Sequence, residues 1–288
     1  MKLLGIINYF TISLSILLMG QSCTQEPPLQ NTDWAKYNLK GAVKSIEEAS
    51  YYVIVKDGAI LKGAKEENSF SKQILFNRKG KVTFYNTFEG DGSLYLQNRY
   101  QYSDDGVLRK ISIFKLAERY MGKDTFIYND KGLLLEKISL SSKDSINNKE
   151  VYQYNTEGKV SQFQLYSFKG NLLTTIQYQY NKQGLKEKIT EFYPDGSLNR
   201  MRIYRYDAAG NEISSHWINA DNSFFAKWHY KYDQYKNQTE KLTLDEKDKV
   251  SIKREYHYKY DKEDNWTEQI KYENGVPKLI TLLKIEYY

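Results

Sequence analysis

The chain has 288 residues, of which 40% are hydrophobic, 27% charged and 15% aromatic. So many aromatic residues, 27 of them tyrosine, exclude a disordered chain and suit half-buried positions on pleated sheets. The net charge is +6, but lysine and arginine are spread among the acidic residues. A nucleic-acid binder concentrates its basic residues on one stripe, so we expect a solvated mixed-charge surface and no nucleic-acid partner.

Residues 1–22 have the layout of a signal peptide, with Lys2 before an uncharged apolar run over 3–20. The only cysteine follows at once, in the stretch LLMGQSC. This stretch resembles the lipobox of bacterial lipoproteins, although Gly20 and Gln21 depart from its usual residues. The resemblance implies that Cys23 carries a lipid and that the chain contacts a membrane through it. Ordinary secretion and a retained transmembrane helix are the alternatives.

Residues 23–37 are expected to be the lipid-anchored tether, because this stretch is polar and contains Pro27 and Pro28. A single cysteine leaves the mature chain without an internal disulfide, so packing and sheet hydrogen bonds must stabilise it. We expect a bacterial outer-membrane or cell-surface lipoprotein, on the periplasmic or the extracellular face.

A 26-residue repeat fills residues 38–288. The second aromatic of each aromatic-x-aromatic motif recurs every 26 residues from Phe76 to Tyr232, and the next, Tyr260, follows after 28. A glycine four residues after each motif keeps the same phase until Lys236 replaces it. A fixed period of this kind predicts a repeat architecture. The structural repeat positions are Tyr102, Gly106, Tyr128, Gly132, Tyr154, Gly158, Tyr180, Gly184, Tyr206, Gly210, Tyr232 and Tyr260.

Each period contains two turn signals. Asn155 and Gly158 stand at the first and fourth positions of a type I turn, after which glycine can take a positive φ. Twelve residues later a second turn position recurs, occupied by Gly92, Asp144, Gly170, Gly196, Asn222 and Asp248. Two turns leave two strands of about eight residues, so each period is one β-hairpin.

Alternation predicts the faces of these strands. Trp228, Tyr230 and Tyr232 share one face, and the residues between them, such as Lys231, share the other. We therefore expect an all-β fold of antiparallel hairpins in one long meander of about sixteen strands. So large a sheet should curl around its aromatic face into a spiral, an open barrel or a shell. The final strand, 282–288, would form an exposed edge, and residues 56–69 a longer excursion.

Tyr-x-Tyr-[Asn/Asp]-x-x-Gly at this spacing resembles the YD repeat of rearrangement-hot-spot (Rhs-type) and teneurin proteins. The similarity covers residues 74 to about 265, with the best copy at 204–213. It implies a curled β-strand shell and an extracytoplasmic scaffold or binding surface, with no catalytic residues to transfer. A weaker local similarity, over 192–204, is to the hairpin repeats of the MORN group.

No catalytic constellation and no cofactor motif is present, so we expect a protein without enzymatic activity, catalytic residues or a cofactor. His229 and His257 are expected on the charged face two strands apart, about 10 Å, which is too far for one metal ion. His216 has no phase relation to them. We therefore expect surface histidines and no metal site.

The tryptophans are the best candidates for ligand-binding residues, because flat aromatic side chains bind sugars and protein partners. Trp228 is in phase with the inward row, so Trp217 and Trp266 are the better candidates for ligand binding. The first hypothesis is a non-enzymatic lipoprotein that serves as a β-repeat scaffold or binding module for a protein partner. The alternatives are a cell-surface protein that binds or processes carbohydrate, and a partner or immunity protein for a secreted effector.

Overall fold

The computed structural model describes residues 32–66, 70–116 and 118–288, so the signal peptide, Cys23 and most of the expected tether lie outside the described residues. Within these ranges the chain forms one short helix and nineteen antiparallel strands. The elements in chain order are α1 (Asp33–Lys36), β1 (Val43–Lys56), β2 (Ala59–Lys65), β3 (Ser71–Phe76), β4 (Val82–Phe88), β5 (Leu94–Tyr102), β6 (Leu108–Lys115), β7 (Arg119–Tyr128), β8 (Leu134–Ser141), β9 (Ile146–Tyr154), β10 (Val160–Ser167), β11 (Leu172–Tyr180), β12 (Lys186–Phe192), β13 (Leu198–Tyr206), β14 (Glu212–Asn219), β15 (Phe224–Tyr232), β16 (Gln238–Leu244), β17 (Val250–Tyr260), β18 (Trp266–Glu273) and β19 (Val276–Tyr287). No described helix has the length and apolar character needed to cross a membrane.

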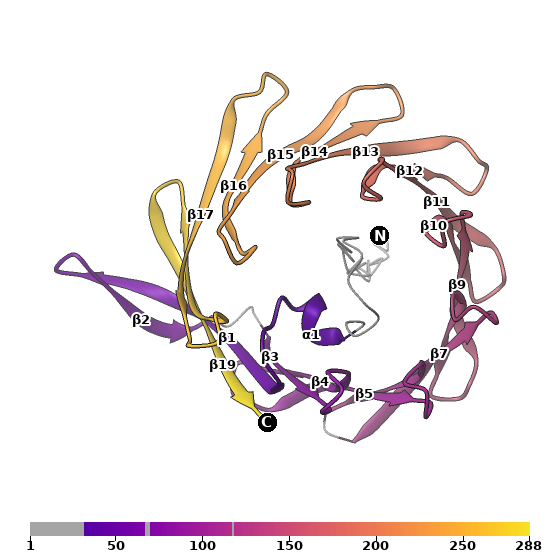
Figure 1. Ribbon diagram of the computed structural model, residues 1–288, viewed down its shortest axis with the longest axis horizontal. Coiled ribbons are helices and arrows are strands. Elements are labelled where there is room, and N and C mark those ends of the chain that lie inside the picture. Colours follow the sequence, from indigo (N-terminus) through magenta and orange to yellow (C-terminus); the bar gives the residue numbers. More distant parts are fainter. Residues whose placement is uncertain (1–31, 67–69, 117) are drawn as a thin grey trace, which may run out of the picture.

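The sheet closes on itself, which corrects the expected open spiral. β1 pairs with β3 along one edge and with β19 along the other, from Val43 to Tyr52. Eighteen strands, all except β2, therefore form one ring (Figure 1). The C-terminal strand is paired rather than exposed, because closure removes the two edges that a spiral would leave.

Each period folds into one hairpin with two turns, as predicted. The backbone N–H of Gly158 donates to the carbonyl oxygen of Asn155 over 3.0 Å, and the Asn155 side chain accepts from two further N–H groups of the turn. Gly158 has a φ of +75°, the left-handed conformation that glycine adopts without strain. Lys236 and Asp264 take the same conformation in the degenerate units, with φ values of +67° and +60°.

The Tyr-x-Tyr motif also closes the wall of the barrel between strands. The ladder between β10 and β11 runs from the Gln162–Gln177 pair to the hairpin tip. The two strands are not paired between Gln162 and the start of β10, or between Gln177 and the end of β11. In the part that is left open, the Tyr180 hydroxyl donates to the Val160 carbonyl oxygen over 2.7 Å. A tyrosine hydroxyl reaches the carbonyl twenty residues earlier in five further units, at Tyr102, Tyr154, Tyr206, Tyr232 and Tyr258.

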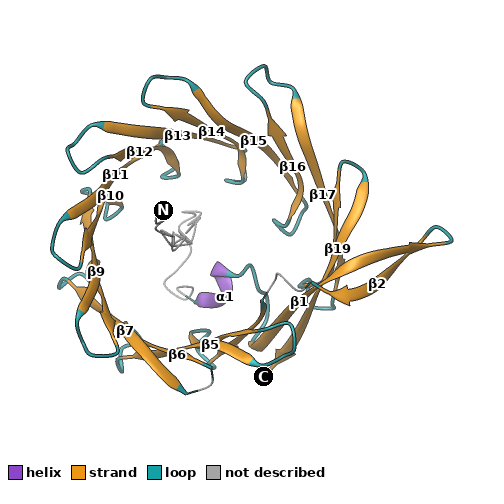
Figure 2. Cartoon of the chain, turned by 180° about the vertical axis from the view of Figure 1, so that it is seen from behind, coloured by secondary structure: helices purple, strands orange, loops and turns teal. Residues whose placement is uncertain are grey.

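The aromatic rows face the inside of the barrel, as the alternation predicts. α1 lies inside the ring (Figures 1 and 2), and its Trp34 packs against Phe76, with ring centroids 6.5 Å apart. Residues on the opposite side of each strand, such as Lys231 and Lys259, are exposed on the outer wall. The outer wall is therefore the charged face and the inner wall the tyrosine-rich face.

The N-terminal tether ends earlier than the expected residue 37. The Trp34 indole donates to the Val43 carbonyl oxygen over 2.8 Å, and an Asp33 carboxylate oxygen accepts from the backbone N–H of Val82 over 2.8 Å. Asn38 donates to the Tyr235 carbonyl oxygen across the ring. These bonds attach α1 and the residues after it to the barrel, so the polar composition of this stretch did not mark the true boundary.

Apolar packing is concentrated at the seam where β1 closes the ring. Val43, Ile46, Ile74, Phe76, Val82 and Leu283 form one buried cluster, capped by Trp34. Elsewhere the described inner-face side chains are mostly half-buried rather than buried. A barrel of eighteen strands is too wide for its inward side chains to meet at the axis, so the inner wall stays accessible to water.

β1 is longer than the ring requires, and its distal half leaves the ring as a hairpin with β2. This hairpin projects from the barrel in Figure 1 and accounts for part of the expected excursion over 56–69. It has no counterpart in the 26-residue repeat.

Candidate functional site

The two kinds of turn alternate along the meander and so give the barrel two different ends. The Asn-x-x-Gly turns lie at one end, which we call the turn rim, together with α1. The second turns lie at the other end, which we call the tip rim, and the hairpin tips there flare outwards in Figure 1. The turns of the turn rim are predominantly polar, as in Asn129–Gly132 and Asn155–Gly158.

The tip rim carries an exposed large apolar side chain at most of its hairpins. These side chains are 48% to 65% exposed: Leu116, Ile146, Phe168, Tyr193, Phe225, Val250 and Val276. Ile54 and Val55 continue the series onto the β1–β2 hairpin. Scattered exposed apolar residues need no explanation, but these recur at corresponding positions of successive hairpins at one end of the barrel, which makes them candidate contact residues.

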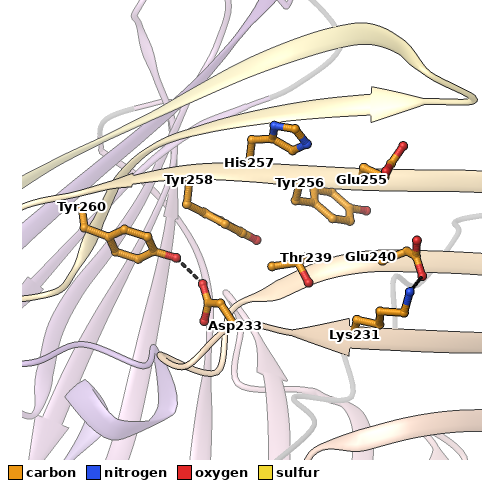
Figure 3. A pocket seen from close by; sticks show the side chains of 9 residues that line it. All are labelled: Lys231, Asp233, Thr239, Glu240, Glu255, Tyr256, His257, Tyr258 and Tyr260. Atoms are coloured by element: carbon orange, nitrogen blue, oxygen red, sulfur yellow. Dashed lines mark hydrogen bonds and ion pairs between the residues drawn. The ribbon is translucent and has the colours of Figure 1, made fainter.

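A hollow of about 460 Å³ opens through the wall between β16 and β17 (Figure 3). The β16–β17 ladder stops at Glu240 and Glu255, in the same phase as the other hairpins. Beyond the end of the ladder, β17 continues for five residues to Tyr260, whereas β11 continues for only three beyond the end of its ladder. β17 therefore has eleven residues, two more than β11, β13 and β15, which have nine each. The 28-residue interval before Tyr260 is therefore the sequence signal of this opening.

Tyrosines line the inner side of the hollow. The Tyr258 hydroxyl takes the usual carbonyl bond, to Gln238 over 2.8 Å, and Tyr260 reaches on to the Asp233 carboxylate (Figure 3). Burial raises the pKa of Tyr258 to about 12, and burial together with the bond to Asp233 raises the pKa of Tyr260. Both phenols are therefore neutral hydrogen-bonding groups at physiological pH.

Two carboxylates face each other across the outer side of the hollow. Glu240 pairs with Lys231 at 2.9 Å, and Lys253 contacts both Glu255 at 2.8 Å and Glu240 at 3.6 Å. Hydrogen bonding to Glu255 raises the pKa of Lys253. Both carboxylates are thus paired with lysine, an arrangement that holds the neighbouring strands together.

The histidines lie on the outer wall. His257 contacts the Tyr272 ring at a centroid distance of 4.7 Å, and His229 is exposed. Burial and the nearby Lys227 lower the pKa of His216. Among the described residues, no group of three or more His, Cys, Asp or Glu side chains could hold a metal ion.

The inner wall over β12–β17 carries arginines and lysines among aromatic rings. The Arg202 guanidinium lies 4.4 Å from the Tyr204 ring centroid, 5.6 Å from that of Trp217 and 5.9 Å from that of Trp228. One Arg202 nitrogen, Nη2, donates to both Glu212 and Ser215 over 3.0 Å. Cation–ring contacts of this kind recur along the same wall at Lys186, Arg200 and Lys241.

The structure separates the two tryptophans singled out from the sequence. Trp217 stands on the inner wall beside Trp228, among the arginines, and is half-buried. Trp266 packs against the seam cluster and against Tyr258, with ring centroids 6.1 Å apart. Trp217 thus lies where a ligand can reach it, whereas Trp266 contributes to the closure of the ring.

Sequence reasoning missed Arg202, Lys186 and Lys241 as site residues. All three stand in phase with the tyrosine rows, so the alternation assigned them to the inner face without distinguishing them. Only Lys186 stands where earlier units have an apolar residue, Val160 and Leu134, and that replacement is the signal that could have found it.

No family model matches the chain, and no curated protein matches it. Among solved structures, a porin-like protein from Bacteroides uniformis is similar over 86% of this chain and 98% of its own, with 13% identity and a TM-score of 0.44. A second porin-like protein, from Bacteroides vulgatus, gives 15% identity and a TM-score of 0.37. The structure titled TcdB2-TccC3-Cdc42 matches 81% of this chain and only 14% of its own, with 13% identity and a TM-score of 0.31.

Proposed function

We propose that this chain is a non-enzymatic, lipid-anchored barrel of the bacterial cell envelope that binds a protein partner through the apolar side chains of its tip rim. The collection of Leu116, Phe168, Tyr193 and Phe225 at one rim carries the proposal. Exposed aromatic and aliphatic side chains on neighbouring hairpins are the usual anchors of a protein–protein interface.

The charge of the outer wall favours a barrel surrounded by water. Lys253, Glu255 and His257 lie on that wall in the middle of β17, and Lys231 and Lys259 lie nearer its rim. In a barrel that spans a bilayer, each outward lysine or arginine near the midplane costs about 2–4 kcal/mol. The proposed lipid on Cys23 would therefore hold a water-immersed barrel at the membrane surface.

The position of the N-terminal segment favours a protein over the anchoring membrane as the partner of the tip rim. Asp33 and Asn38 are bonded at the turn rim, to Val82 and to the β15–β16 turn. A tether that leaves from there directs the turn rim towards the membrane and the tip rim away from it. The tips then face the compartment in which soluble or membrane-bound partners are found.

Site-specific photo-crosslinking in the native envelope tests this proposal. A photoreactive residue at Phe168 or Phe225 should capture one protein species, and the same residue at Gln183 on the turn rim is the matched control. Affinity capture with residues 24–288 from a solubilised envelope extract should recover that species in stoichiometric amount. Capture of phospholipid at the tips, or equal capture from both rims, would contradict the proposed orientation and partner.

A further inference from the structure

The inner wall carries a group of cations that its own carboxylates do not neutralise. The group, which we call the Arg202 cluster, consists of Arg202, Lys186, Lys241, Trp217 and Trp228. Arg202 is paired with Glu212, but neither lysine has a carboxylate partner among the described residues. The cluster therefore keeps two positive charges in excess on a half-buried surface.

Burial and the neighbouring cations both disfavour the charged forms of Lys186 and Lys241. Burial, together with Arg202, lowers the pKa of Lys186, and burial with Arg254 and Arg202 lowers the pKa of Lys241. The Arg202 Nε is buried and has no hydrogen-bond acceptor in the described structure. An anion placed among these groups would relieve the repulsion between them.

The aromatic members of the cluster offer faces and donors as well. Trp228 lies between Arg202 and Lys241, which are 5.9 Å and 5.2 Å from its ring, and Trp217 lies near Arg200 at 4.5 Å. Neither indole N–H donates to an acceptor in the part of the chain that the structure describes. Flat rings beside hydrogen-bond donors suit a ligand with both apolar C–H faces and polar groups, which is the chemistry of a sugar ring.

The arrangement is elongated. Arg200, Arg202, Tyr204 and Tyr206 follow one another on the inner face of β13, and four alternate positions of a strand span about 20 Å. Trp217 and Trp228 stand beside this row on the next two strands. A row of that length accommodates several linked sugar units rather than one small anion.

We infer that the Arg202 cluster is a binding site for an anionic oligosaccharide, one whose sugars carry carboxylate or sulfate groups. The sugars lie beside Trp217 and Trp228 and accept hydrogen bonds from the indole N–H groups, and the acidic groups are held by Lys186, Lys241 and the Arg202 guanidinium. This site is on the inner wall, so it is independent of the proposed contact between the tip rim and a protein.

Titration calorimetry with three oligosaccharide probes of equal length tests the inference: an oligogalacturonate, a heparin-derived oligosaccharide and a neutral cello-oligosaccharide. One or both acidic probes should bind, and the neutral probe should bind at least about tenfold more weakly, because charge-assisted hydrogen bonds are lost. The acidic probe that binds more tightly identifies the acidic group. Failure of both acidic probes to bind at millimolar concentration, or equal binding of the neutral probe, would overturn the inference.

Matched lysine variants locate the site. Lys241→Gln and Lys186→Gln should each weaken binding about tenfold, whereas Lys259→Gln removes an exposed outer-wall lysine and should leave it unchanged. Trp217→Ala should also weaken binding, since a purely electrostatic attraction would not depend on the indole. Equal losses in the Lys241 and Lys259 variants, or no loss in Trp217→Ala, would show general attraction to a basic protein and refute the site. Unchanged circular dichroism and melting temperature in each variant separate a binding defect from unfolding.

Discussion

Replacing Tyr180 with phenylalanine removes one hydroxyl and, with it, the 2.7 Å bond to the Val160 carbonyl oxygen. The ring remains, so its packing is preserved and the change isolates the hydrogen bond. A bond of this kind contributes about 1 kcal/mol net, and the carbonyl that loses its partner adds to the cost when water does not replace it. We expect Tyr180→Phe to lower the free energy of unfolding by about 1 kcal/mol, which is about 2 °C in melting temperature for a domain of this size.

The neighbouring tyrosine provides the control. Tyr178 lies two residues earlier on the same inner face, and its hydroxyl has no hydrogen-bond partner among the described residues. Tyr178→Phe should therefore change the free energy of unfolding by less than about 0.5 kcal/mol. Urea titrations followed by tryptophan fluorescence and far-ultraviolet circular dichroism measure both variants. Equal losses in the two variants would refute the structural role assigned to the bond.

Three further predictions concern the stability of the barrel. Burial raises the pKa of Tyr180 to about 12, so the folded state favours the protonated phenol. The contribution of this phenol to the free energy of unfolding should be fully present below about pH 10 and should be lost between about pH 10 and 12. Circular dichroism measures the unfolding, and absorbance at about 295 nm measures the ionisation of tyrosine. A Cβ at Gly122, where φ is +144°, would stand 2.0 Å from the Leu140 carbonyl oxygen, so Gly122→Ala should cost at least about 2 kcal/mol in urea titrations, and Gly92→Ala, with open space around it, clearly less. Trp34→Ala should cost about 3 kcal/mol because it opens a cavity against the seam cluster, and a loss within error would show that α1 is not needed for closure.

The repeat made the local structure predictable. Turn chemistry at Asn155 and Gly158 and alternation around Tyr230 and Tyr232 are local signals, and the structure confirms both the turns and the inward aromatic face. Closure of the ring is a contact between residues far apart, such as Ile46 and Ile285, and no local pattern encodes it. β1 lies outside the period, so the sequence did not indicate that it would pair with both β3 and β19.

The candidate sites were less predictable for a different reason. A repeat pattern defines what its units share, whereas the sites arise where single units depart from it. Arg202 and Lys241 occupy inward positions whose residue type varies from unit to unit, with Glu150 and Ile176 at the position of Arg202, and the two extra residues before Tyr260 open the wall. Trp266 conversely fits the profile of a ligand platform by composition, but its distance from the seam could not be known before β1 and β19 were paired.

Ring closure also constrains how the number of strands can change. β1 and β19 meet antiparallel, which requires an even number of strands around the circumference. Each 26-residue period contributes one strand in each direction, so duplication or loss of a whole period preserves this parity and changes only the diameter of the barrel. Loss of a single strand would bring the two ends together in parallel, with the wrong hydrogen-bond pattern for the existing ladder. The hairpin is therefore the smallest unit by which a barrel of this kind can grow or shrink.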